Sequence, residues 1–295
     1  MSPSDLPEAA ERRLGHGAFS SGLSVADFAA CLEMDLEPVG LVQGFCAMQW
    51  SSYAGGLRRG MTPYGGGQGG YVENYQCPHG MISGEHRMWG QNYQQTWIEA
   101  AWTEGFSSAY SRMLEEATAL GADGIVGVVD TQSSLSDAGI IEFHLLGTAV
   151  KLKGAPVATG TPWTTYLAGQ RLAKLFEAGY APVSVVAVVS SVRVWAYCMT
   201  EYLMGSGGAS MWAQNTTPME IEQVVRAQSA ARAIARKSAR DQLHGDSLHG
   251  ADLQVLEREF EQGDVEIQTL LRGNRVRRFK EFEALPVPQP TVRLS

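Results

Sequence analysis

The side chains best suited to chemistry gather in one short stretch of the first half of the chain. Cys77, His79 and His86 fall within ten residues, and Glu85 precedes the second histidine. A thiolate and two imidazoles are ligands that transition metals prefer, so this stretch is a candidate metal site. Its spacing matches no standard zinc pattern such as paired Cys-x-x-Cys knuckles, and an irregular polar loop is the favoured alternative. Cys77, His79 and His86 are the predicted ligands of such a metal, and no other cofactor is indicated.

Other reactive side chains give weaker signals. Cys31 lies on the apolar side of a predicted helix and Cys46 in a predicted strand, and free cysteines in such places usually pack in the core. His244 and His249 follow a predicted helix end, where imidazoles commonly contact exposed carbonyls. No order of cysteine, histidine and acidic residues indicates nucleophilic catalysis. We therefore expect a protein that is not an enzyme.

The composition argues against several classes of protein. The chain has 295 residues, of which 44% are hydrophobic and 18% charged, which is typical of a globular protein. Its net charge of −8 gives no general attraction to nucleic acid or anionic membranes. No apolar run reaches the ~20 residues of a spanning helix, and the N-terminus lacks the apolar core of a signal peptide. With only four cysteines, we expect a reduced, cytoplasmic protein without nucleic-acid or membrane partners.

The charge is divided unevenly between the two halves. Residues 1–150 contain 6 basic and 17 acidic residues, whereas residues 151–295 contain 17 and 14. Arg232, Arg236 and Arg240 follow one another at intervals of four, so they share one face of a predicted helix. Nucleic acid would require such a face, but the aromatic platforms that bind single strands are missing from this helix. A solvated face, or a partner surface for the acidic half, is the favoured interpretation.

A glycine-rich stretch stands out in the first half. Residues 55–70 hold eight glycines, with several tyrosines around them, and lack the Lys-Ser/Thr of a phosphate-binding loop. Tyrosine and tryptophan are common interface anchors. We therefore interpret residues 51–95 as an insertion that is structural, an oligomer surface or a binding site.

The two halves contain an internal repeat. Residues 31–50 resemble residues 174–195, with Pro38 matching Pro182 at a separation of 144 residues. Similar segments in the same order indicate two copies of one structural unit. Two further matches follow: Gly121-Ala122-Asp123 with Gly250-Ala251-Asp252, and Leu145–Val150 with Leu270–Val276.

Each copy is predicted to contain the elements α–β–α–β–β. Ser24 is a plausible N-cap with Asp27 as its capping-box partner, and Thr161-Pro162 predicts the start of a second short helix. Thr96 and Thr217 each begin a T-x-x-E capping box before a long helix. The expected helices are 24–34, 96–120, 163–178 and 217–243, and the expected strands are 39–50, 124–131, 140–152, 183–198, 253–261 and 265–272.

The stretch from Trp102 to Leu152 contains the segments MLEEATALGADGIVGVVDTQ and EFHLLGTAVKL. It resembles the YbjQ-like family, which is labelled a heavy-metal-binding domain. The family signature is a helix ending in an acidic-Ala-x-x-Leu-Gly-Ala-Asn/Asp turn, a Val-Gly-Val strand, and a strand that closes on Gly-Thr-Ala-Val. The resemblance implies a dodecin-like two-layer α/β unit that assembles as a pentameric ring. The motif residues are Gly121, Ala122, Asp123, Gly127 and Gly147, with Gly250, Asp252 and Gly273 in the diverged second copy.

These motif residues have structural explanations. Gly121 permits a positive φ at the helix end, and Ala122 is small enough to pass beneath the helix. Asp123 can bond backbone amides at the turn into the strand. Gly127 within a strand suggests a close backbone approach. The motif therefore predicts a fold and does not predict catalysis.

The expected fold class is α+β, a tandem repeat of dodecin-like, YbjQ-like two-layer units in which one long helix covers a small antiparallel sheet. The expected domains are residues 1–155, including the insertion at 51–95, and residues 156–295. The expected function is that of a non-enzymatic oligomeric scaffold or small-ligand-binding protein, and the alternative is transition-metal binding through the Cys/His loop. The expected partner is another copy of the chain, in a homo-oligomer such as a five-fold ring.

Overall fold

A computed structural model describes residues 10–11, 15, 20–49, 92–135, 140–154, 160–194, 222–259 and 265–280. Its elements form two sets with the same order, helix–strand–helix–strand–strand, as the repeat predicts. The first unit comprises α2 (Val25–Glu33), β1 (Leu36–Gln49), α4 (Thr96–Ala119), β3 (Gly124–Leu135) and β4 (Ile140–Leu152), with β2 (Asn92–Gln94) before α4. The second unit comprises α5 (Gly169–Glu177), β6 (Tyr180–Val194), α7 (Glu222–Leu243), β7 (Ser247–Glu259) and β8 (Val265–Arg278), with β5 (Trp163–Thr164) before α5.

Each unit builds an antiparallel sheet in which its last strand lies in the middle. The first sheet has the order β1-β4-β3 and the second has the order β6-β8-β7, so the two units share one topology. Each sheet also takes a short strand from the other half of the chain. β5 pairs in parallel with β3, and β2 pairs antiparallel with β6. The expected α+β class of small sheets under long helices is confirmed.

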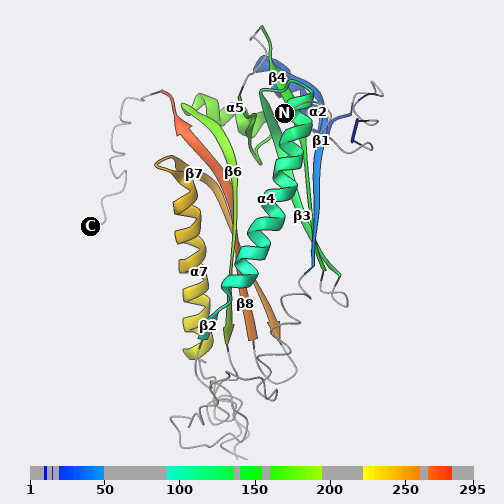
Figure 1. The fold of residues 1–295 in the computed structure, drawn as a ribbon. Coiled ribbons are helices and arrows are strands. Elements are labelled where there is room, and N and C mark those ends of the chain that lie inside the picture. The colour runs from blue at the N-terminus through cyan, green and yellow to red at the C-terminus, as the bar shows by residue number, and fades with distance from the viewer. Residues whose placement is uncertain are drawn as a thin grey trace, which may run out of the picture.

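The elements stack in alternating layers of sheet and helix (Figure 1). α4 lies between the two sheets, with contacts to β1 and β4 on one side and to β6 on the other. α7 covers the opposite face of the second sheet through β6 and β8. Consequently α4 is buried by two layers, and the largest hydrophobic cluster contains residues of both sheets together with the α4 side chains Trp102, Phe106 and Met113.

The helix α7 packs on its sheet through small side chains. The buried residues of α7 include Ala227, Ala231, Ala235 and Ala239, one on each turn, and these small side chains let the helix lie close to the sheet. Ser190 Oγ donates a hydrogen bond of 2.7 Å to the carbonyl of Ala231 at this contact.

Among the described residues, no helix is long and apolar enough to cross a membrane.

Strand register corrects part of the predicted repeat. β3 and β4 shift register between Val126 and Val129, and β7 and β8 shift between His249 and Asp252. Gly127 and Gly250 lie at these two bulges with φ values of 60° and 63°. Gly250 therefore matches Gly127, and the predicted alignment of Gly121-Ala122-Asp123 with Gly250-Ala251-Asp252 is wrong.

The end of the second long helix has a different sequence from the end of the first. Gly121 has a φ of 64° after α4, whereas His244 and Gly245 have φ values of 48° and 92° after α7. Asp246 directly precedes β7, as Asp123 directly precedes β3. Both helix ends and bulges need a residue that tolerates positive φ, so a shared Gly-Ala-Asp triplet could not distinguish the two places.

The two units also have similar hydrogen bonds near their starts. The amide of Gly22 donates to Thr148 Oγ1 over 3.1 Å in the first unit. The amide of Tyr166 donates to Asn274 Oδ1 over 2.8 Å in the second. Thr148 and Asn274 are both the residue that follows the glycine of the middle strand, Gly147 or Gly273. The segment before each short helix is thus tied to the middle strand of its own sheet.

The predicted helix caps have mixed outcomes. Ser24 caps α2 and bonds the amide of Asp27 over 3.1 Å, as predicted. The predicted start at Thr161-Pro162 is wrong, because Trp163 and Thr164 form β5 and α5 begins only at Gly169.

The capping box at Thr96 also has a different outcome from the one predicted. Gln95 occupies the N-cap position of α4, and no side chain there bonds the helix. Glu99 instead accepts the amide of Ser191, on β6, over 3.0 Å. Thr217 lies outside the described residues, because the described part of this helix, α7, begins at Glu222.

Candidate assembly surface

The predicted metal ligands Cys77, His79 and His86 lie outside the described residues, as does most of the insertion at 51–95. Within the described residues, no group of three or more histidine, cysteine, aspartate or glutamate side chains could hold a metal ion. Cys31 and Cys46 are free and buried, as predicted for core cysteines. Burial raises the pKa of the Cys31 thiol, which stays protonated at neutral pH.

The motif residues occupy turns and tight contacts. Asp123 Oδ2 accepts the amide of Leu152 on the neighbouring strand over 2.7 Å. The amide of Ala122 donates to Ala117 at the end of α4. A Cβ on Gly127 would lie 3.3 Å from side-chain carbons of Ala168 and Leu23. The segments just before α5 and α2 therefore both come close to β3. Gly147 and Gly273 lie in the middle strands, and Asp252 accepts a hydrogen bond from Gln254.

An ion pair joins the two sheets beside α4. Arg272 Nε on β8 donates to Asp130 Oδ2 on β3 over 2.7 Å, and the two side chains are 19% and 7% exposed. Tyr166 is nearby and its hydroxyl has no hydrogen-bond partner among the described residues. Burial raises the pKa of Tyr166, and the charge of Asp130 adds to that effect. The junction between the units therefore includes a polar contact that is largely closed to water.

Hydrogen bonds fasten both α4 and β5 to the second sheet. Tyr110 on α4 bonds Thr164 Oγ1 over 2.8 Å, and the same oxygen accepts the amide of Val185 on β6 over 2.9 Å. At the start of α4, the amide of Gln95 donates to the carbonyl of Ser191 over 2.8 Å. The first unit therefore contacts both the outer edge and the inner face of β6.

The outer face of the first sheet has no comparable cover in the described residues. Phe45 is 47% exposed and Val129 is 56% exposed on this face. The ring of Phe45 contacts the ring of His144 edge to face, with 6.2 Å between their centroids. Glu142, two residues before His144 on β4, lies on the same face. Exposed apolar and aromatic side chains on a sheet face are typical of an interaction surface.

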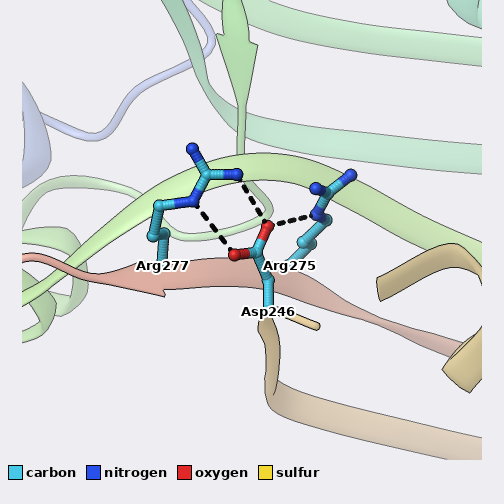
Figure 2. A network of polar contacts seen from close by, with 3 residues as sticks. All are labelled: Asp246, Arg275 and Arg277. Carbon is cyan, nitrogen blue, oxygen red and sulfur yellow. Dashed lines mark hydrogen bonds and ion pairs between the residues drawn. The ribbon is translucent and has the colours of Figure 1, made fainter. Parts of the chain in front are cut away.

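Two arginines of the second unit form an ion-pair network with one aspartate (Figure 2). Asp246 accepts hydrogen bonds from Arg275 Nε over 2.6 Å and from Arg277 Nε over 3.0 Å. These bonds from Arg277 and Arg275 hold the pKa of the Asp246 carboxyl below its usual range. Their contribution to stability is therefore present at neutral pH and is lost as falling pH protonates Asp246. The network joins the turn before β7 to β8.

Comparison with known proteins identifies one part of the chain. Residues 81–153 match the family described as "YbjQ_1: Putative heavy-metal-binding". A UPF0145 protein from Halorubrum lacusprofundi is 49% identical over 51 residues, which are 17% of this chain and 48% of that protein. The resemblance of this segment to the YbjQ-like family is therefore confirmed.

A second relative covers more of the chain. The "Encapsulin nanocompartment protein Rv1762c" from Mycobacterium tuberculosis is 30% identical over 193 residues, which are 63% of this chain and 62% of that protein. The chain thus spans less than two thirds of the curated relatives it matches. No solved structure matches it significantly.

The YbjQ-like segment carries most of the junction between the sheets. It includes β2, α4, β3 and β4, and therefore Tyr110 and Asp130. No motif in the sequence points to these two residues or to their partners Thr164 and Arg272. One signal was available for Asp130, a charged residue that directly follows the apolar run of β3. Its partner could not be found in this way, because it lies 142 residues further along the chain.

Proposed function

We propose that the protein is a non-enzymatic, cytoplasmic scaffold that assembles with copies of itself. The observation that carries the proposal is the contrast between the two sheets. The inner face of the second sheet is buried against α4, whereas the corresponding face of the first sheet exposes Phe45 and Val129. A face of this kind gains free energy when a partner removes its apolar area from water.

The relatives support an assembly role. The YbjQ-like segment supplies α4, which serves two sheets at once within this chain. The Mycobacterium relative is described as an encapsulin nanocompartment protein, and its match extends well beyond that segment. A second copy of the same chain is the simplest partner, because most protein oligomers are built from identical subunits.

The mass of the protein in solution tests this proposal. We expect light scattering after size exclusion to give a multiple of the 31.9 kDa chain mass at micromolar concentration. A dilution series should reduce the mass in steps if the oligomer dissociates. A 31.9 kDa species at all concentrations would contradict the proposal.

Metal binding is a second candidate function. The family description names heavy metals, and Cys77, His79 and His86 offer a donor set that transition metals prefer. His86 lies inside the matched segment, whereas Cys77 and His79 precede it.

Metal analysis of purified protein distinguishes this candidate from the scaffold proposal. If the loop binds a metal, we expect stoichiometric zinc, copper or nickel, and a loss of at least tenfold in Cys77→Ser and His79→Ala. His249→Ala, which changes an exposed histidine elsewhere, is the matched control and should retain the metal. Metal content that is negligible in the wild type, or unchanged in the loop variants, would contradict this candidate.

A further inference from the structure

The contact between α4 and the second sheet offers a template for self-association. On β6, the side chains of Val185, Ala187 and Val189 are 7%, 6% and 6% exposed and belong to the same cluster as α4. Leu270 on β8 joins them with 4% exposure. The long helix of the first unit, α4, therefore packs on its own sheet with one side and covers the sheet of the second unit with the other side.

Strand register shows which residues of the first sheet occupy the same places. β1 and β6 both shift register directly after a proline, Pro38 or Pro182, which are 144 residues apart. With this alignment Phe45 corresponds to Val189, and His144, its cross-strand partner, corresponds to Leu270. Phe45 is 47% exposed where Val189 is 6% exposed. The first sheet thus has an equivalent face that nothing in the described part of the chain covers to the same extent.

Among the described residues, α7 has a corresponding side that faces away from its own sheet. Ala231, Ala235 and Ala239 face the second sheet, as Ala109 and Met113 face the first. On α4, Tyr110 directly follows Ala109, and its hydroxyl reaches Thr164 beside the second sheet. On α7, the residues that directly follow the three alanines are Arg232, Arg236 and Arg240.

The chemistry of the two free surfaces is complementary. Arg236 and Arg240 are exposed guanidinium groups, which stack on aromatic rings and pair with carboxylates. The outer face of the first sheet presents the Phe45–His144 ring pair and the carboxylate of Glu142. The acidic excess of residues 1–150 and the basic excess of residues 151–295 favour the same orientation.

The sheet edges follow the same pattern. β2, which precedes α4, pairs with the outer edge of β6. In the described residues, the equivalent strand β1 is paired on one side only, by β4. β7 likewise has an open outer edge where its equivalent, β3, takes up β5. Such open edges readily accept a strand from another chain.

We infer that copies associate head to tail, with the arginine side of α7 of one chain on the outer face of the first sheet of the next. This inference rests on the proposed scaffold function and names its interface. The contact is heterologous, because the two surfaces differ, so its repetition produces a closed ring or an open filament.

Complementary variants test this arrangement. Phe45→Asp damages the sheet surface and leaves α7 intact, whereas the double variant Arg236→Glu/Arg240→Glu damages α7 and leaves the sheet intact. We expect each variant alone to have the 31.9 kDa mass of one chain. Mixed in equal amounts, they should form a dimer of twice that mass, because one undamaged sheet can still receive one undamaged helix.

Controls separate this inference from the proposed function. Phe279→Asp changes another exposed aromatic residue, at 59% exposure, and should keep the wild-type mass. Val129→Asp is a second sheet variant for the case in which Phe45→Asp fails to fold by circular dichroism. A monomeric wild type contradicts the scaffold proposal itself. A wild-type oligomer that survives both sheet variants, or monomeric variants that do not pair when mixed, overturns the head-to-tail interface and leaves the scaffold proposal standing.

Discussion

Replacing Asp130 with alanine is expected to lower the free energy of unfolding by about 3–5 kcal/mol. Asp130 and Arg272 are 2.7 Å apart, and their side chains are only 7% and 19% exposed. Removal of the carboxylate leaves a guanidinium with no partner in a place that water reaches poorly. The change should be measured by urea unfolding at fixed protein concentration, since association would make stability concentration-dependent.

Two variants make this result specific to the buried pair. The double variant Asp130→Ala/Arg272→Met should be less destabilised than Asp130→Ala alone, because it removes both charges and leaves neither uncompensated. Arg277→Ala removes a side chain that is 63% exposed and pairs with Asp246 at the surface. Its effect should be far smaller. Equal losses in Asp130→Ala and Arg277→Ala would show that the junction is not a closed site.

Replacing Gly44 with alanine is expected to destabilise the first unit by about 3 kcal/mol, the upper end for an overpacked core. A Cβ at Gly44 would overlap the carbonyl oxygen of Ala109 and lie 2.9 Å from the amide nitrogen of Met113. Both atoms belong to the backbone of α4, so no side-chain rotation can relieve the overlap. For a protein of this size the loss corresponds to a fall in Tm of roughly 6–12 °C, measurable by circular dichroism.

Gly160→Ala is the matched control for this prediction. A Cβ at Gly160 would meet no atom within 4 Å, so the same chemical change should leave Tm within about 2 °C of the wild type. A Gly44→Ala variant that melts like the wild type would mean that α4 does not lie this close to β1.

Much of the fold could be predicted because its signals are local. Phe143 and Leu145 alternate with Glu142 and His144, and the structure places all four in β4, with Phe143 and Leu145 buried. Ser24 and Asp27 are three residues apart and form the predicted cap. Side-chain alternation and helix caps depend on residues within one turn or one strand, so a sequence pattern can indicate them.

Other predictions failed where distant parts of the chain decide the local structure. Thr161-Pro162 has the form of a helix start, but the backbone of Trp163 instead bonds the carbonyl of Asp123 at the edge of the first sheet. Glu99 has the spacing of a capping-box residue, but its carboxylate bonds Ser191 of the second unit. In both cases a partner from the other half of the chain competes with the local interaction.

The sequence by itself determined the order of elements in the two units, the positions of most helices and strands, and the YbjQ-like character of residues 102–152. Only the tertiary structure showed that α4 is shared by both sheets, that β2 and β5 cross between them, and that Asp130 meets Arg272. The physical reason is the range of the interactions. Periodicity and caps are settled by neighbours in the chain, whereas the junction depends on contacts between residues far apart in sequence, which no local pattern records.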